Sequence, residues 1–143
     1  MSELTVQGQV DRLHDIMRHY PQVKMPTQHF LLDGIYVRQI FIPAGTAFVG
    51  RVHKKQHYFM VLKGSAAVTT ESGPTILQAG MVLMSGPGTR RAGVTAEDCI
   101  FCSIHRTEAT CLADIEEDLV EFDPTSRYGV GNEILPPLVE KLS

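Results

Sequence analysis

His53 and His57 stand four residues apart on either side of a short polar segment, and Gly64 follows seven residues after the second histidine. Imidazole is the commonest protein ligand for metal ions, and two imidazoles placed where the chain reverses into a new strand can converge on one cation. The pair therefore predicts a metal site at the beginning of a strand. Histidines at strand ends also form hydrogen bonds with the backbone or with each other and need no metal, so this alternative stays open.

Two arginines, Arg90 and Arg91, follow directly after a glycine-rich turn. A guanidinium binds a carboxylate or a phosphate through two parallel hydrogen bonds, which makes these residues candidates for binding an anion. The alternative is that they form ion pairs with Glu97 or Asp98 or face the solvent. These two acids are also the nearest in sequence that could supply a general base.

The cysteines indicate neither a disulfide framework nor a metal site. Cys99 and Cys102 are three residues apart in a segment that reads as a strand, and side chains at that spacing point to opposite faces. The chain holds three cysteines. An odd number without disulfide spacing predicts a reducing, cytoplasmic environment.

Composition excludes several classes of function. Of the 143 residues, 43% are hydrophobic and 20% charged, and the net charge of −3 gives no basic field for nucleic acid. No apolar run approaches the roughly 18 residues that a membrane-spanning helix needs, and the first residues do not resemble a secretion signal. We expect a soluble protein that binds neither nucleic acid nor membrane.

The elements that must position these residues follow from the spacing of apolar side chains. Apolar residues among the first twenty recur on one helical face, which predicts a helix that ends before Pro21. Between residues 28 and 105, short runs of valine, isoleucine, phenylalanine and tyrosine alternate with turn residues. Strands this short, without helices between them, predict an antiparallel sandwich or barrel.

A second helix is expected after the strands. Its apolar face would contain Leu112, Ile115, Leu119 and Phe122, and its acidic residues would face water. The predicted organisation is an N-terminal helical segment over 1–27, a barrel over 28–107, and a C-terminal helix with an irregular tail over 108–143. The apolar part of that tail, 134–139, is expected to dock on the barrel or on a second subunit.

The stretch from about residue 40 to 105 resembles the cupin superfamily of small jelly-roll barrels. Two glycines bracket the first cupin motif, and Gly45 and Gly64 match them. Between them His53 takes the place of the second motif histidine, His57 that of the glutamate, and Arg51 that of the first histidine. The chain is also similar to stand-alone cupin-like proteins of bacteriophages and bacteria, many of which have no assigned activity.

The second cupin motif is matched at its glycines, Gly80 and Gly88, whereas Gly86 replaces a proline and Arg91 replaces a histidine. The resemblance implies an all-β antiparallel jelly-roll barrel with N-terminal and C-terminal helices. It also implies that Arg91 points into the barrel cavity, because the residue that it replaces is a metal ligand. An inward arginine beside a metal favours a bound anion.

Jelly-roll topology adds a third histidine to the pair. In such a barrel the last strand runs antiparallel to the strand that begins at His57, so His105 at the end of that last strand lies beside His57. We predict that His53, His57 and His105 form a metal site at the mouth of the barrel. Three neutral imidazoles suit zinc, iron, nickel or copper.

The same topology places Tyr36 and Arg38 on one face of the first barrel strand, next to the last strand. They are expected to join Arg91 and Arg90 in binding a small anionic molecule. A metal-binding cupin with an anionic ligand is therefore the first hypothesis, with no reaction assigned, because dioxygenase, isomerase and lyase chemistries all occur in similar proteins. The alternative is a non-catalytic protein that binds a small molecule or another protein. A homodimer is expected in either case.

Overall fold

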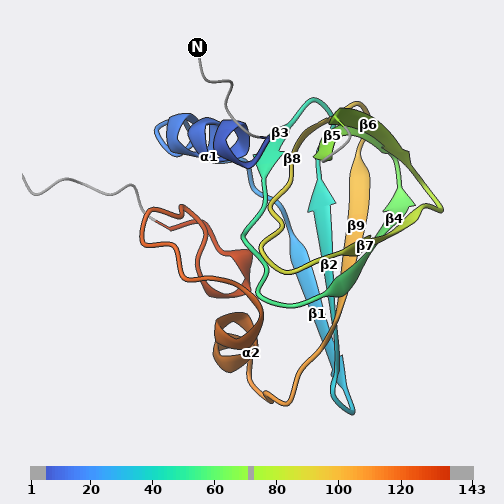
Figure 1. The fold of residues 1–143 in the computed structure, drawn as a ribbon, viewed down its shortest axis with the longest axis vertical. Coiled ribbons are helices and arrows are strands. Elements are labelled where there is room, and N and C mark those ends of the chain that lie inside the picture. The colour runs from blue at the N-terminus through green and yellow to red at the C-terminus, as the bar shows by residue number, and fades with distance from the viewer. Residues whose placement is uncertain (1–5, 71–72, 136–143) are drawn as a thin grey trace, which may run out of the picture.

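The computed structural model describes residues 6–70 and 73–135, and these residues form two antiparallel sheets flanked by helices (Figure 1). The larger sheet has the strand order β1-β2-β9-β4-β7 and the smaller one β3-β8-β5-β6. The larger sheet contains β1 (Thr27–Leu32), β2 (Ile35–Ile42), β4 (His57–Lys63), β7 (Val82–Ser85) and β9 (Cys99–Arg106). The smaller sheet contains β3 (Ala47–Val49), β5 (Ser65–Thr70), β6 (Gly73–Gln78) and β8 (Ala92–Thr95).

Turn residues determine where these strands begin and end. The chain reverses between β1 and β2 through Asp33 and Gly34, both with positive φ (48° and 79°). Two consecutive residues with positive φ are typical of a two-residue hairpin turn whose twist matches that of the paired strands. The turn sets the register Leu32 opposite Ile35, which continues to Thr27 opposite Ile40.

The core lies between the two sheets. Alternate residues of β2, β4 and β9 point inward from the larger sheet and meet residues of β5 and β6 from the smaller one. This apolar cluster is almost fully buried and contains Ile42, Val61, Ala66, Val68, Leu77, Cys99 and Phe101. It fills the half of the barrel opposite the end where β4 begins and β9 ends.

Both predicted helices are present in the described residues, and each ends earlier than expected. Helix α1 (Val6–Met17) ends before Tyr20, which is 63% exposed. Helix α2 (Leu112–Leu119) buries Ile115 and Leu119, but the chain leaves the helix at Val120 with extended backbone angles. Phe122 therefore lies outside the helix and is 85% exposed, so its predicted place on the apolar face is wrong.

Helix α2 covers the end of the larger sheet where β9 ends and β4 begins. Ile115 and Leu119 pack against Tyr36 of β2, and the ammonium groups of Lys54 and Lys55 bind α2 at Glu117 O and Asp118 Oδ1, both at 2.7 Å. After α2 the chain forms a short 3-10 helix, η1 (Val130–Asn132), which contacts α2 and β1. Of the apolar tail, Ile134 and Leu135 are each 40% exposed, and residues 136–139 lie outside the described residues.

Candidate metal centre and adjoining cavities

Three histidines converge at the end of the barrel that α2 covers. One nitrogen from each of His53, His57 and His105 lies within 4.8 Å of the others. The ring centroids are 4.1 Å apart for His53 and His57, 4.3 Å for His57 and His105, and 5.1 Å for His53 and His105. His57 and His105 are buried and His53 is half-buried. The three residues predicted as metal ligands therefore meet in one place.

Strand pairing explains how two of these rings come together. Strands β4 and β9 are antiparallel neighbours, with Phe59 opposite Ser103 and Val61 opposite Phe101. Continuing this register by two residues places His57 opposite His105, and the alternation of side chains sends both rings to the inner face. The predicted phase of the two strands is confirmed.

His53 reaches the site by a different route from the one expected. The predicted strand 47–53 stops at Val49, and residues 50–56 form an irregular segment. His53 is held instead by an isolated bridge to Val120, just after α2, and by hydrogen bonds with the backbone of Gly88 and Thr89. The C-terminal helix thus positions a residue of the candidate site.

Burial keeps these imidazoles neutral. Desolvation is the main cause that lowers the pKa of His53 to about 2, and the neighbouring His57 and His105 lower it further. Burial likewise lowers the pKa of His105 to about 3, with a further decrease caused by His57 and Arg38. The pKa of His57 is also lowered by burial. A neutral imidazole has the free lone pair that a metal ion requires.

The hydrogen bonds of the three rings suit a metal site. His57 Nδ1 donates to the carbonyl of Lys55 at 3.1 Å, which leaves the lone pair of Nε2 available for a cation. The Nδ1 atoms of His53 and His105 are buried, and no described residue forms a hydrogen bond with either of them. Buried polar atoms without partners are rare in folded proteins and call for an explanation such as a bound ion.

No carboxylate belongs to this histidine cluster within the described residues. Glu116 of α2 borders a small cavity of about 30 Å³ together with His53 and His105, and Asp118 of the same helix is the acid that raises the pKa of His105. Glu97 and Asp98, which the sequence suggested as a general base, precede β9, at the opposite end of that strand from His105. Eight residues of strand separate the two ends by about 25 Å, so neither acid can act at the histidines.

Arg91 lies inside the barrel, as its place in the motif implies. Its Nη1 donates to the buried Ser85 Oγ at 2.5 Å, and its guanidinium carbon lies 5.4 Å from the centre of the Phe59 ring. Both partners are on the inner face of the larger sheet. Arg91 is close enough to His53 and His57 to lower the pKa of each.

Tyr36 and Arg38 also lie where topology placed them. In the pairing of β2 with β9, Tyr36 is opposite His105 and Arg38 is opposite Ser103. Tyr36 is buried, its hydroxyl is 2.5 Å from His29 Nδ1, and burial raises its pKa to about 12. Within the described residues no hydrogen bond or ion pair reaches the Arg38 guanidinium, whose pKa is lowered by burial.

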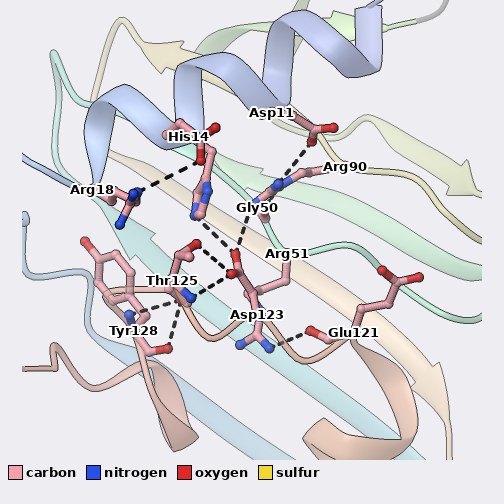
Figure 2. Close-up of polar contacts among 12 residues, drawn as sticks. Asp11, His14, Arg18, Gly50, Arg51, Arg90, Glu121, Asp123, Thr125 and Tyr128 are labelled. Atoms are coloured by element: carbon pink, nitrogen blue, oxygen red, sulfur yellow. Dashed lines mark hydrogen bonds and ion pairs between the residues drawn. The ribbon is translucent and has the colours of Figure 1, made fainter. Parts of the chain in front are cut away.

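Arg90 points away from Tyr36, Arg38 and Arg91, and it links α1 to the barrel through polar contacts. Its Nη1 is 3.1 Å from Asp11 Oδ1, its Nη2 is 3.6 Å from Asp123 Oδ2, and its Nε donates to Gly50 O at 2.8 Å (Figure 2). Asp123 also lies 3.6 Å from His14 Nε2. The acids that pair with Arg90 therefore come from α1 and the C-terminal segment, and the suggested pairing with Glu97 or Asp98 is wrong for this arginine.

A larger cavity of about 390 Å³ opens between α1, β2, β3 and residues 126–132. Arg38 and Arg51 line both this cavity and the small one beside His53 and His105. Sequence reasoning did not assign Arg51 to a site, although it stands where cupins have their first motif histidine. It also missed Glu116, for which the sequence holds no signal, because an acid on an amphipathic helix is typical of a solvated face.

The architecture is that of known cupins. The chain is similar in fold to a cupin superfamily protein from Desulfitobacterium hafniense, with a TM-score of 0.51 and 13% identity over 62% of this chain and 83% of that chain. It is similar to the Cupin_2 domain of an XRE family transcriptional regulator from Enterobacter cloacae (TM-score 0.50, 13% identity, 59% and 98% covered). The cupin domain of Cnp3 from Schizosaccharomyces pombe gives a TM-score of 0.50 and 16% identity, with 61% and 67% covered.

The likeness at these low identities establishes the fold, and the chain is an all-β cupin barrel with flanking helices, as predicted. No protein-family model matches the sequence. No curated protein matches it either. None of the helices in the described part of the chain has the length and apolarity needed to cross a membrane.

Proposed function

We propose that this protein is a metal-binding cupin whose barrel accepts a small anionic molecule. The single observation that supports metal binding is that His53, His57 and His105 each place one ligand nitrogen within 4.8 Å of the others. Their lowered pKa values keep them neutral and able to bind a cation. Zinc, iron, nickel and copper all accept three imidazoles and leave a position open for a further ligand.

A bound metal would supply positive charge that polarises a ligand atom at the open position. The surrounding side chains supply the rest of the environment. Arg38 and Arg91 offer guanidinium donors on the inner face of the barrel, Tyr36 offers a hydroxyl beside His105, and Glu116 borders the same small cavity. An anionic ligand would neutralise the arginines, which otherwise repel a neighbouring cation.

A second candidate is a non-catalytic binding protein that uses the same cavity without turnover. The favouring observation is that no carboxylate belongs to the histidine cluster among the described residues, so the metal's charge is not balanced as in the cupin motif. Mass spectrometry of candidate ligands after incubation with the metal-loaded protein separates the two functions. Conversion supports an enzyme, and tight binding with recovery of intact ligand supports a binding protein.

The metal site is tested by elemental analysis. Protein purified under metal-replete conditions is expected to contain one transition metal per chain, and His57→Ala should lower the affinity for zinc by more than about 100-fold because one of three ligands is lost. His19→Ala is the matched control: His19 is exposed and far from the cluster in sequence, so its removal should leave the metal content unchanged. Native protein without stoichiometric metal would overturn the proposal.

We also propose that two copies pair through the outer face of the larger sheet. Two rows of aligned side chains cross all five strands there, and neither row contains a charged residue. The first row is Phe30, Val37, Ile104, Tyr58 and Met84, and the second is Gln28, Gln39, Cys102, Met60 and Val82. Phe30, Tyr58, Val82 and Met84 are each more than half exposed.

Exposed apolar side chains aligned over neighbouring strands differ from the singly scattered apolar residues that are normal on the surface of a monomer. This face suits a second copy because an uncharged apolar surface is complementary to itself in a two-fold dimer. Light scattering is expected to give twice the mass of one chain, and Tyr58→Lys with Met84→Lys should give monomers. Ile76→Lys, at an equally exposed position on the smaller sheet, should leave the dimer intact. A monomeric native protein at about 100 µM would contradict the pairing.

A further inference from the structure

The larger cavity has an apolar wall and a cationic wall. Its volume of about 390 Å³ is in the range of small-molecule sites. Strands β2 and β3 form the inner side, and α1, the segment after it and residues 126–132 close the outer side. The apolar lining includes Met17, Met25, Ile40, Ile42, Phe48 and Val49.

Four arginines line the same cavity: Arg18, Arg38, Arg51 and Arg127. Among the described residues that border it there is no aspartate or glutamate. Four cationic groups around one cavity repel each other. Burial is the main cause that lowers the pKa of Arg38, and Arg51 adds to the lowering, whereas Tyr36 and Glu116, which line the small cavity, oppose it. A bound anion would remove this repulsion.

These guanidiniums also keep donors unused. The Nε atoms of Arg18, Arg51 and Arg127 are buried, and no described residue accepts a hydrogen bond from them. Arg18 Nε has an ion-pair contact with Asp15 Oδ1 at 4.0 Å. Two of the three groups are held in place by backbone carbonyls, because Arg51 Nη2 donates to Glu121 O at 2.7 Å and Arg127 Nη1 donates to Arg18 O at 3.0 Å. Neutral carbonyls orient a guanidinium without cancelling its charge.

We propose that this cavity binds an amphipathic anion, with a carboxylate or phosphate head between Arg38 and Arg51 and an apolar body along Ile40 and Phe48 toward α1. This inference names the ligand class of the proposed function and rests on its anion site, but it does not require the metal. The head group is placed at the inner end because Arg38 and Arg51 also line the small cavity beside His53 and His105. The ligand head would thus lie next to the histidines.

The volume limits the size of the ligand. At about 30 Å³ for each water-sized group, 390 Å³ accommodates roughly a dozen non-hydrogen atoms. Octanoate and octyl phosphate fit this limit and carry the two head groups that a guanidinium recognises. Nucleotides exceed this limit, and a sugar would place hydroxyl groups against the apolar side chains that form much of the lining.

Calorimetric titration of the whole chain with octanoate, octyl phosphate, octanol and acetate tests both halves of the inference. We expect octanoate, octyl phosphate or both to bind more than 10-fold tighter than octanol and more than 100-fold tighter than acetate. From butanoate to octanoate, each added methylene should tighten binding by about four-fold. Equal binding of octanol would overturn the anion site, and equal binding of acetate would overturn the apolar site. The stronger of the two anions identifies the head group.

Two variants locate the head group. Arg38→Met and Arg51→Met keep most of the side-chain volume and remove the charge, so each is expected to weaken binding of the preferred octyl anion by more than 10-fold. Arg106→Met is the control, because Arg106 is exposed and outside the cavity. If neither variant weakens the anion while circular dichroism shows native folding, the proposed position is wrong.

The titrations are carried out on metal-free and on zinc-loaded protein, with zinc content measured separately. If the protein takes up zinc but neither the metal-free nor the zinc-loaded form binds octanoate or octyl phosphate, the metal site is supported and this inference is overturned. Octyl-anion binding by the metal-free protein together with failure to take up zinc supports this inference and rejects the metal. The two failures are therefore distinguishable.

Discussion

Replacing Gly64 by alanine should destabilise the protein by about 2–5 kcal/mol. Gly64 joins β4 to β5 with φ +83°, and a Cβ at this position would lie 2.3 Å from Asp98 O and 2.8 Å from Cys99 Sγ. Left-handed backbone costs an alanine about 1–2 kcal/mol, and overpacking against a backbone carbonyl adds about 1–3 kcal/mol. Urea unfolding followed by circular dichroism measures the free energy of unfolding.

Gly88→Ala separates the two contributions. Gly88 has nearly the same φ, +79°, but nothing lies within 4 Å of a Cβ built on it. Its replacement is expected to cost only about 1–2 kcal/mol, the part due to backbone conformation. If both alanine variants lost the same free energy, the close contact with Asp98 would not be the reason that β4 ends in glycine.

The metal-free protein should lose stability steeply as the pH falls below about 6.5. In the unfolded chain each histidine takes up a proton near pH 6.5. In the folded chain His105 stays neutral down to about pH 3 and His53 to about pH 2. Between these values the unfolded state binds more protons, so the free energy of unfolding decreases with decreasing pH.

The expected slope is about 1.4 kcal/mol per pH unit for each of the two histidines, hence about 2–3 kcal/mol between pH 6 and pH 5. The charged and titratable groups around His53 and His105 lower the pKa of these histidines as burial does, except Asp118, which raises the pKa of His105. His57, Arg38 and Arg91 lower the pKa of His53, whereas for His105 the lowering by His57, Arg38 and Lys55 is opposed by Asp118. Urea unfolding in a chelating buffer at several pH values measures the slope.

Glutamine variants assign this slope to residues. His53→Gln cannot take up a proton in either state, so the slope should fall by about 1.4 kcal/mol per pH unit. His19→Gln, at an exposed position, should leave the slope as in the native protein. A slope that does not change in His53→Gln would show that other groups cause the loss of stability in acid.

An antiparallel barrel follows from local features of the sequence, and the resemblance to cupins implied the strand order that places His105 beside His57. Alternation of apolar residues sends His57, Phe59 and Val61 to the same face of β4, and the antiparallel pairing with β9 brings His105 beside them. The same argument placed Tyr36 and Arg38 next to β9. These predictions succeeded because strand period and register depend on the pattern of neighbouring residues.

Residues outside the strands were harder to place. His53 was expected at the end of a strand, but the strand stops at Val49 and a bridge to Val120 holds the histidine. Arg90 was expected near Arg91 in the cavity, but its partners are Asp11 of α1 and Asp123. Both outcomes depend on where the two terminal helices dock. An amphipathic pattern predicts that a helix packs against the core, but it does not predict which surface the helix contacts.

The sequence by itself thus determined an antiparallel barrel, because alternation and turn residues are encoded within a few neighbouring positions, and its cupin resemblance implied the strand order that brings His57 and His105 to one inner face. Only the tertiary structure decided that α2 brings His53 to them, that Arg38 and Arg51 border both cavities, and that Arg90 fastens α1. The reason is that these contacts join segments up to about 80 residues apart. Their geometry follows from the packing of whole elements and from the burial of charge between them.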